Sequence, residues 1–163
     1  IEIAAIRFTD GNPVDRFVTL INPERKIDPF ITDITGISDD MIRKKPIESI
    51  IIDEFLEFLT DLPLVAHNIS FDKSFLDALC ERFKKPTKIN TLFDTLQLSR
   101  TFLFFHPVHD LGSISEYFGF SSAGSHRAEK DTVNCGVIFQ RLIQEAASYP
   151  LKTNTTDSDL ANR

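Results

Sequence analysis

The sequence lacks three features that mark common protein classes. No apolar run approaches the roughly 20 residues that a membrane-spanning helix needs, so no membrane association is expected. No glycine-rich phosphate-binding loop occurs, which argues against a P-loop nucleoside triphosphatase. Only two cysteines are present, Cys80 and Cys135, and each lies on an apolar helical stripe. A disulfide framework is therefore not expected, and the chain is predicted to be a reduced, cytoplasmic protein.

A positive net charge is also lacking. The 163 residues carry 18 Lys and Arg against 24 Asp and Glu, which gives a formal net charge of −6. A protein that held nucleic acid only by neutralising its phosphates would be expected to be basic. The excess of acidic residues does not exclude an enzyme whose carboxylates hold divalent cations, because those cations then carry the positive charge.

Turn signals and apolar periodicity divide the chain into short strands and helices. Residues 1–8 and 14–21 are β-prone and flank the Asp-Gly-Asn-Pro turn at residues 10–13, which predicts a hairpin. Residues 22–37 contain Asn-Pro, Asp-Pro and Thr-Gly and are predicted to form an irregular loop. The further elements are predicted in the order helix 38–46, helix 51–62, strand 64–66, helix 70–83, strand 90–93, helix 94–102, helix 111–118 and a last helix from about 126 to 147.

This mixture of elements predicts an α/β fold class. No change of composition divides the chain, so we expect one domain over residues 1–148. Residues 149–163 are polar and are expected to be a tail or a linker to another module.

Two carboxylates lie on helical faces that are otherwise apolar. Asp72 is in line with Leu76 and Leu79, and Asp131 is in line with Cys135 and Ile138. A buried carboxylate costs several kcal/mol unless a cation, a proton or hydrogen bonds compensate it. The pattern therefore indicates a metal site, although each acid could equally be placed to favour the positive first turn of its helix.

A histidine precedes the second of these acids. His126 is predicted at the start of the last helix, and Asp131 follows about one and a half turns later. A neutral imidazole near pH 7 is a suitable general base. The alternative is an ordinary surface histidine at a helix end.

Several short segments together resemble a known family. Residues 66–72, Ala-His-Asn-Ile-Ser-Phe-Asp, resemble the second exonuclease motif of the DEDDh class. Residues 125–131, Ser-His-Arg-Ala-Glu-Lys-Asp, resemble its third motif. The segments at residues 1–8, 20–23, 34–37 and 93–96 occur in the order typical of this family, which includes the proofreading epsilon subunit of bacterial DNA polymerase III. The resemblance covers residues 1 to about 147 and implies a ribonuclease H-like mixed sheet flanked by helices.

The resemblance implies a function and a set of site residues. The family removes nucleotides from DNA 3′ ends with two divalent cations, Mg or Mn, that stabilise the attacking and leaving oxygens. By position, Asp72 and Asp131 are implied as metal ligands and His126 as the general base. The resemblance further implies contacts to the 3′-terminal nucleotide from Thr35, Gly36 and Asn68, although Asn68 could instead cap the loop before its helix. Asp94 is interpreted as a helix cap.

The implied partners are single-stranded DNA 3′ ends, with RNA as a possible substrate, and a polymerase, a helicase or a fused module. A role in DNA replication or repair follows from the same resemblance. One departure is large, because the family's first motif, Asp-x-Glu on the first strand, is absent from the sequence. Glu2 matches a different position, inside the second strand. We therefore expect an Asp-x-Glu strand upstream of Ile1 in the natural protein, and little nuclease activity without it.

Other functions are weaker or remain open. A serine hydrolase lacks its Gly-x-Ser-x-Gly motif, and a zinc site at His106 and His109 would need two more ligands. The serious alternative is a catalytically inactive ribonuclease H-like module that binds nucleic-acid ends or a polymerase or helicase partner.

Overall fold

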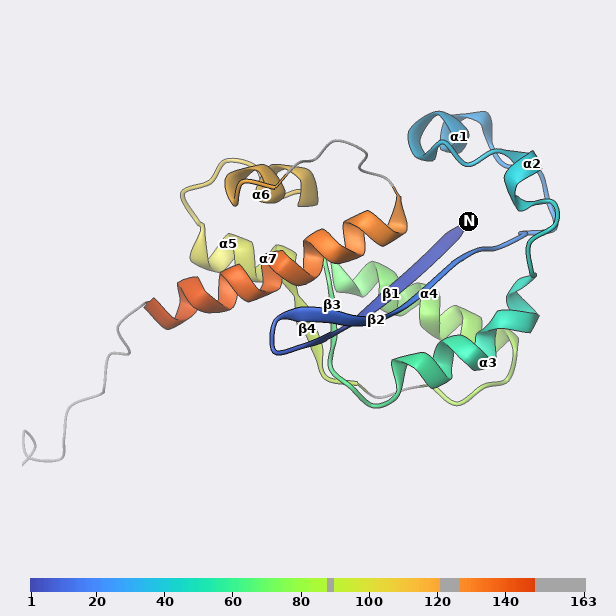
Figure 1. Ribbon diagram of the computed structural model, residues 1–163, viewed down its shortest axis with the longest axis horizontal. Coiled ribbons are helices and arrows are strands. Elements are labelled where there is room, and N and C mark those ends of the chain that lie inside the picture. The colour runs from blue at the N-terminus through green and yellow to red at the C-terminus, as the bar shows by residue number, and fades with distance from the viewer. Residues whose placement is uncertain (88–89, 121–126, 149–163) are drawn as a thin grey trace, which may run out of the picture.

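The computed structural model describes residues 1–87, 90–120 and 127–148. In these residues, two small sheets are packed among helices, so the predicted α/β class is confirmed (Figure 1). The predicted tail at residues 149–163 lies outside the described residues. No helix in the described ranges is both long and apolar enough to cross a membrane.

The predicted hairpin opens the fold. Strand β1 (Glu2–Thr9) pairs with β2 (Asn12–Leu20) in antiparallel register. Gly11 has φ +82° in the turn, a conformation that glycine adopts without strain. The turn is shorter than predicted, because Asn12 and Pro13 already belong to β2.

The segment predicted as an irregular loop contains a helix, which corrects that prediction. Helix α1 (Pro29–Thr35) begins after Asp28, whose carboxylate accepts a hydrogen bond from the backbone N–H of Phe30 at 2.9 Å. It ends at Gly36, which has φ +70° and donates its N–H to the Thr32 carbonyl. An Asp cap followed by Pro in the first turn is a helix-start signal, but the several turn dipeptides of this segment obscured it.

Helices α2 (Asp39–Ile42) and α3 (Glu48–Leu59) follow. Both agree in place with the prediction, although α2 is shorter and α3 starts three residues earlier and ends three residues earlier than predicted. One face of α3 is buried, and it packs against the hairpin and against the next long helix. The buried side chains of α3 are those of Ile51, Ile52, Leu56 and Leu59.

The second half of the fold begins with a parallel strand pair. Strand β3 (Leu64–Ala66) pairs with β4 (Leu92–Asp94), and each strand leads into a helix, α4 (Ile69–Arg82) or α5 (Thr95–Phe102). The carboxyl ends of both strands therefore meet at one edge of the sheet. Among the described residues, this pair and the hairpin form separate two-stranded sheets.

The long helix α7 (Ala128–Ser148) joins the two halves of the fold. It contacts β1 and β3, and it also packs against α5 and against α6 (Leu111–Tyr117) (Figure 1). Gly136 faces the ring of Phe8 so closely that an added Cβ would lie 2.5 Å from ring atoms, so glycine is what allows α7 to approach β1. The core between α5, α6 and α7 is formed by Leu103, Ile114, Ile138 and Leu142. Burial of each such side chain contributes roughly 1.5–3 kcal/mol.

Candidate active site

Asp72 lies in the first turn of α4. Asn68 precedes this helix in the left-handed conformation, with φ +67°, and the helix starts at Ile69, one residue earlier than predicted. Asp72 is exposed as a residue, which corrects the expectation that it turns inward with Leu76. Protein atoms still partly desolvate its carboxyl group. This desolvation, together with the negative charge of Asp94, raises the pKa of Asp72.

The raised pKa leads to a prediction about stability without metal. A carboxyl group whose pKa is higher in the folded state binds its proton more tightly there than in the unfolded chain. Its contribution to the free energy of unfolding is therefore most favourable below its ordinary pKa. This contribution is lost as the pH rises through the raised pKa. Asp72→Asn should remove this pH-dependent loss of stability. In metal-free buffer at neutral pH, the variant should therefore be at least as stable as the parent.

Urea unfolding from about pH 3 to 7 with a chelator present tests this expectation. Asp33→Asn, which changes an exposed acid of α1, is the matched control and should follow the parent. If the stability of Asp72→Asn fell with rising pH as steeply as that of the parent, the loss would not be due to Asp72.

Asp94 holds two loops of the site together. Its carboxylate accepts hydrogen bonds from the backbone N–H of Leu96 at 2.9 Å and of Asn68 at 3.0 Å. The first bond confirms the helix-cap interpretation of Asp94. The second fixes the residue from which α4 starts. The sequence does not show this second bond, because it depends on Ala66 and Asp94 being partners in the parallel strand register.

A buried polar network lies behind these loops. The Thr95 hydroxyl donates to the Ala66 carbonyl at 3.3 Å and lies 3.0 Å from Nδ1 of His67. It also lies 3.6 Å from Sγ of Cys135, so the network connects β3 and α5 with α7. Burial raises the pKa of Cys135 to about 11, and the charges of Asp72 and Asp94 add to this effect. The thiol therefore stays protonated, and its burial agrees with its predicted place on an apolar helical stripe.

Cys135 is influenced by one predicted metal ligand and lies on the same helix as the other. Cys135 feels the charge of Asp72, and Asp131 lies about one turn before Cys135 on α7. The start of α4 and the end of β4 thus place negative charge near Cys135, about one turn of α7 from Asp131.

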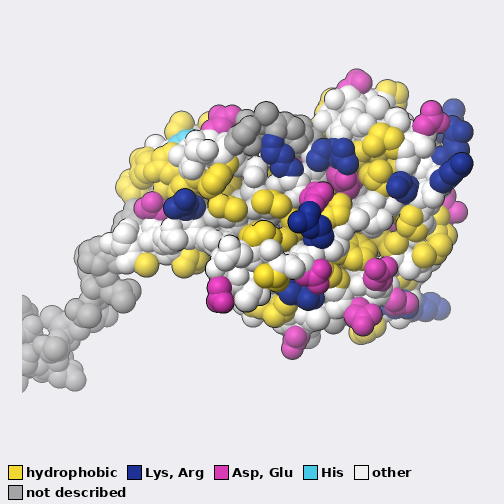
Figure 2. All heavy atoms as spheres, in the orientation of Figure 1, with side chains coloured by type: hydrophobic (Ala, Val, Ile, Leu, Met, Phe, Trp, Pro, Cys, Tyr) yellow, Lys and Arg dark blue, Asp and Glu magenta, His cyan; other side chains and the backbone are white. Residues whose placement is uncertain are grey.

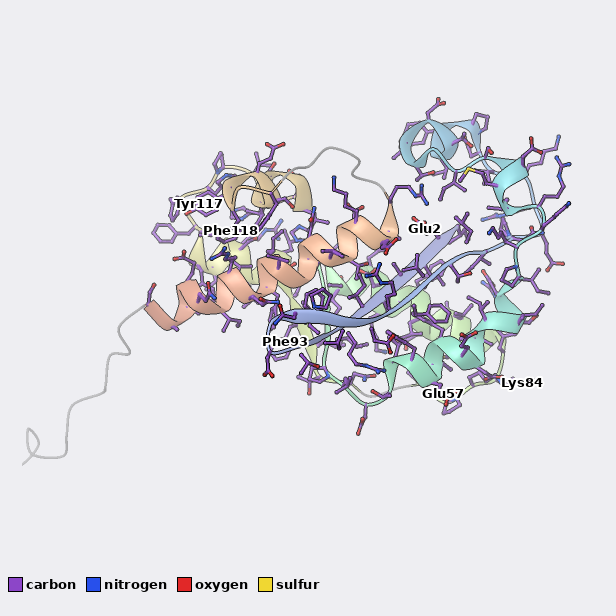
Figure 3. The ribbon with its side chains drawn as sticks, in the orientation of Figure 1. Glu2, Glu57, Lys84, Phe93, Tyr117 and Phe118 are labelled. Carbon is purple, nitrogen blue, oxygen red and sulfur yellow. The ribbon has the colours of Figure 1, made fainter. Side chains whose placement is uncertain are left out.

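Asp131 is half-buried and lines a cavity of about 840 Å³. The opposite part of this cavity is formed by the segment around α1, which includes Thr35. Glu2, at the start of β1, borders the cavity beside the start of α7 (Figure 3). The cavity therefore brings together a predicted metal ligand and a predicted substrate contact that are far apart in the sequence.

Thr35 and Gly36 form the end of α1. The Thr35 hydroxyl donates to the Ile31 carbonyl at 2.7 Å and accepts from the N–H of Ile37 at 3.2 Å. These bonds hold the Thr-Gly-Ile turn in one conformation beside the cavity. Asn68 does not line this cavity. It is exposed at the start of α4, where its side-chain oxygen accepts from the Ser70 hydroxyl at 3.2 Å.

Cationic side chains border the same cavity. Arg25 and Lys26 line it, and neither takes part in an ion pair within the part of the chain that the structure describes. Lys and Arg side chains lie along the side of the molecule that carries α2 and around the start of α7 (Figure 2). The acidic net charge therefore does not prevent a local cationic border, which the sequence analysis did not assign to the site.

The metal-ligating set is incomplete in the described residues. Carboxylate oxygens are the donors that Mg and Mn prefer. However, in residues 1–87, 90–120 and 127–148, no group of three or more His, Cys, Asp and Glu side chains is placed to hold a metal ion. The predicted general base, His126, lies outside the described residues.

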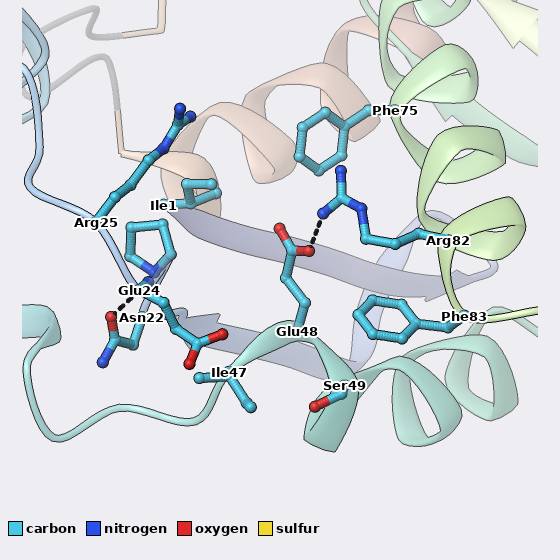
Figure 4. Close-up of a pocket in the computed structure, with 11 residues that line it drawn as sticks. Ile1, Asn22, Glu24, Arg25, Ile47, Glu48, Ser49, Phe75, Arg82 and Phe83 are labelled. Carbon is cyan, nitrogen blue, oxygen red and sulfur yellow. Dashed lines mark hydrogen bonds and ion pairs between the residues drawn. The ribbon is translucent and has the colours of Figure 1, made fainter.

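A second cavity, of about 550 Å³, lies next to the first. Ile1, Pro23 and Arg25 line both cavities. Its far wall carries an ion pair between Arg82 of α4 and Glu48 of α3 (Figure 4). Of the predicted site residues that the structure describes, none lines this second cavity.

Comparison with known sequences gives the family. The family described as Exonuclease (RNase_T) matches residues 1–139. A PolC-type DNA polymerase III from Staphylococcus haemolyticus (strain JCSC1435) is 36% identical over 145 residues, which are 89% of this chain and 10% of that protein. The protein of the same name from Staphylococcus aureus (strain MW2) is 34% identical over 163 residues, which are 99% of this chain and 11% of that protein. The chain thus spans about a tenth of the length of these curated relatives.

Solved structures share the fold. Exonuclease X in complex with 5′ overhanging duplex DNA matches with a TM-score of 0.67 and 22% identity, over 91% of this chain and 84% of that chain. E. coli exonuclease I in complex with a dA16 oligonucleotide matches with a TM-score of 0.73 and 17% identity, over 90% of this chain and 37% of that chain. The ribonuclease H-like fold class is thereby confirmed. With the family match and the sequence relatives, these findings show that the chain belongs to the DEDDh-type exonuclease family.

Proposed function

We propose that this chain is a metal-dependent 3′-to-5′ exonuclease module that hydrolyses the last phosphodiester of a DNA strand. The observation that carries the proposal is the cavity of about 840 Å³, which Thr35 and Asp131 both line. A terminal nucleotide in that cavity would contact the Thr-Gly turn on one side and would present its phosphodiester to the acidic start of α7 on the other.

In this proposal, Asp72 and Asp131 are ligands of two divalent cations, Mg or Mn. The pKa of Asp72 is raised by desolvation and, to a smaller extent, by the charge of Asp94, and a cation beside the carboxylate would offset both effects. When bound, such cations supply charge stabilisation for the attacking and leaving oxygens of the phosphodiester. The Asp-x-Glu pair that the family resemblance also implies is absent from the sequence.

The chain's own residues then have separate tasks. Thr35, Gly36 and Asn68 would orient the 3′-terminal nucleotide, and Arg25 and Lys26 would neutralise phosphates of the entering strand. The imidazole of His126 would take the proton of the attacking water and pass it to solvent.

The setting of the reaction is proposed from the relatives. Two solved structures of this fold contain DNA, one a 5′ overhanging duplex and the other a dA16 oligonucleotide. The sequence relatives are PolC-type DNA polymerases III, so we propose that the chain acts beside a polymerase during DNA replication or repair. Single strands should be preferred, because the terminal bases must be unpaired to enter the cavity.

Matched oligonucleotides test this function in the natural full-length protein. The substrates are one DNA sequence as a 5′-labelled single strand, as a 3′-blocked strand, as a circle and as a blunt duplex, together with the RNA of the same sequence. We expect mononucleotides from the free 3′ end in Mg²⁺ or Mn²⁺, slower release from the duplex, and none with a chelator. Release from the circle or the blocked strand would overturn the proposed polarity, and faster release from RNA would overturn the DNA preference.

A further inference from the structure

Glu2 is a half-buried residue at the start of β1. Its side chain is only 7% exposed. One carboxylate oxygen accepts from Nη2 of Arg127 at 2.7 Å. The other accepts from Nε of Arg127 at 3.1 Å and from the backbone N–H of Ala128 at 2.7 Å. Glu2 therefore binds the start of α7 through one side chain and one backbone donor.

These bonds compensate the burial of the charge. The ion pair with Arg127 is bidentate, a geometry that gives strong and well-oriented hydrogen bonds. The N–H of Ala128 belongs to the first turn of α7, where backbone donors have no partner inside the helix and the helix dipole favours a negative charge. The pKa of Glu2 is lowered, with the bond from Arg127 as the largest cause, so the carboxylate is charged at neutral pH.

The contact reaches the proposed site directly. Arg127 stands between His126 and Ala128 in the chain, and its carbonyl accepts the backbone N–H of Asp131 at 3.1 Å. Glu2 and Asp131 line the same cavity. Figure 3 shows Glu2 beside the start of α7. A change in how Glu2 holds Arg127 would therefore move the backbone that bears Asp131.

We propose that Glu2 is a positioning residue that, through Arg127 and Ala128, sets the orientation of Asp131 for metal binding. This role rests on the proposed function. It differs from a metal-ligand role, because both oxygens of the Glu2 carboxylate already accept hydrogen bonds from α7 and its preceding residue. The hairpin thus contributes to the site through a residue that does not itself contact the substrate.

The test compares Glu2→Gln with Glu129→Gln in the natural full-length protein. Glu129 is a matched control, because it lies in the first turn of α7 but pairs with Arg16 on the surface at 2.8 Å. Glu2→Gln keeps an acceptor for Ala128 and loses the charge. We expect it to weaken Mn²⁺ binding, followed by electron paramagnetic resonance, and to lower kcat, each by about 10–100-fold, with little change in KM for DNA. Glu129→Gln should match the parent.

Arg127→Met provides a second variant, which leaves Glu2 able to cap Ala128. It should show the same direction of change, and the double variant Glu2→Gln with Arg127→Met should be no worse than the more impaired single variant. Circular dichroism confirms folding, and Arg127→Met replaces Glu2→Gln in the comparison if the latter unfolds. Parental Mn²⁺ affinity and kcat in folded Glu2→Gln would overturn the positioning role alone. A parent that neither binds Mn²⁺ nor cuts DNA would overturn the proposed function as well.

Discussion

Asp131→Asn is expected to reduce nuclease activity below detection while the protein stays folded. Asn keeps the size of the side chain but removes the charge that a divalent cation needs. Stabilisation of a phosphodiester transition state by such cations amounts to several kcal/mol, so we expect a loss of more than about 10³-fold in kcat. The release of radiolabelled mononucleotides under single-turnover conditions measures this loss.

Binding of Mg²⁺ separates a lost ligand from a general loss of activity. A cation that binds only the folded state stabilises it in proportion to RT ln(1 + [Mg²⁺]/Kd). The melting temperature of the parent should therefore rise with Mg²⁺ more than that of Asp131→Asn, whereas Glu129→Gln should behave like the parent. Without metal, Asp131→Asn should melt no lower than the parent, because clustered carboxylates repel one another. If Mg²⁺ stabilised both proteins equally, Asp131 would not be a ligand.

His126→Ala is expected to lose about 10²–10⁴-fold in turnover, the range that a positioned general base contributes. Binding of Mn²⁺ and of a 3′-terminated single strand should be retained, because the base acts on the proton and not on the cations. In the parent, kcat should fall as the pH drops below neutral, because a protonated imidazole cannot accept a proton. Rate profiles from about pH 5 to 8 for parent and variant check this, since the variant should lose that limb.

A second histidine serves as the control for this experiment. His106 lies between α5 and α6, where its ring packs against Tyr117 with 5.4 Å between ring centroids. His106→Ala should keep parental turnover and the parental pH profile. A His126→Ala variant with near-parental turnover would remove His126 from the mechanism.

The local elements of the fold could be predicted because their causes are local. A Gly-containing turn between two β-prone runs is enough to form the β1–β2 hairpin, and apolar spacing marks α3 and α7. Helix α1 was missed for a reason that is also local. Its Asp28 cap and its Gly36 end lie close together, and turn dipeptides surround so short a helix. The start of α4 was misplaced because Asn68 enters the helix from a left-handed conformation, which capping preferences do not reveal.

The sequence by itself determined the family and the identity of the proposed chemical groups, because two short motifs each keep their reactive residues within seven positions of one another. Tertiary structure alone decided how these groups meet. The parallel register of Ala66 with Asp94 places the Asp94 carboxylate on the N–H of Asn68, and the packing of α7 against β1 places Glu2 on Arg127. Such contacts depend on the relative position of elements that are far apart in the chain. No local periodicity or propensity encodes that position, and only the packed fold makes it definite.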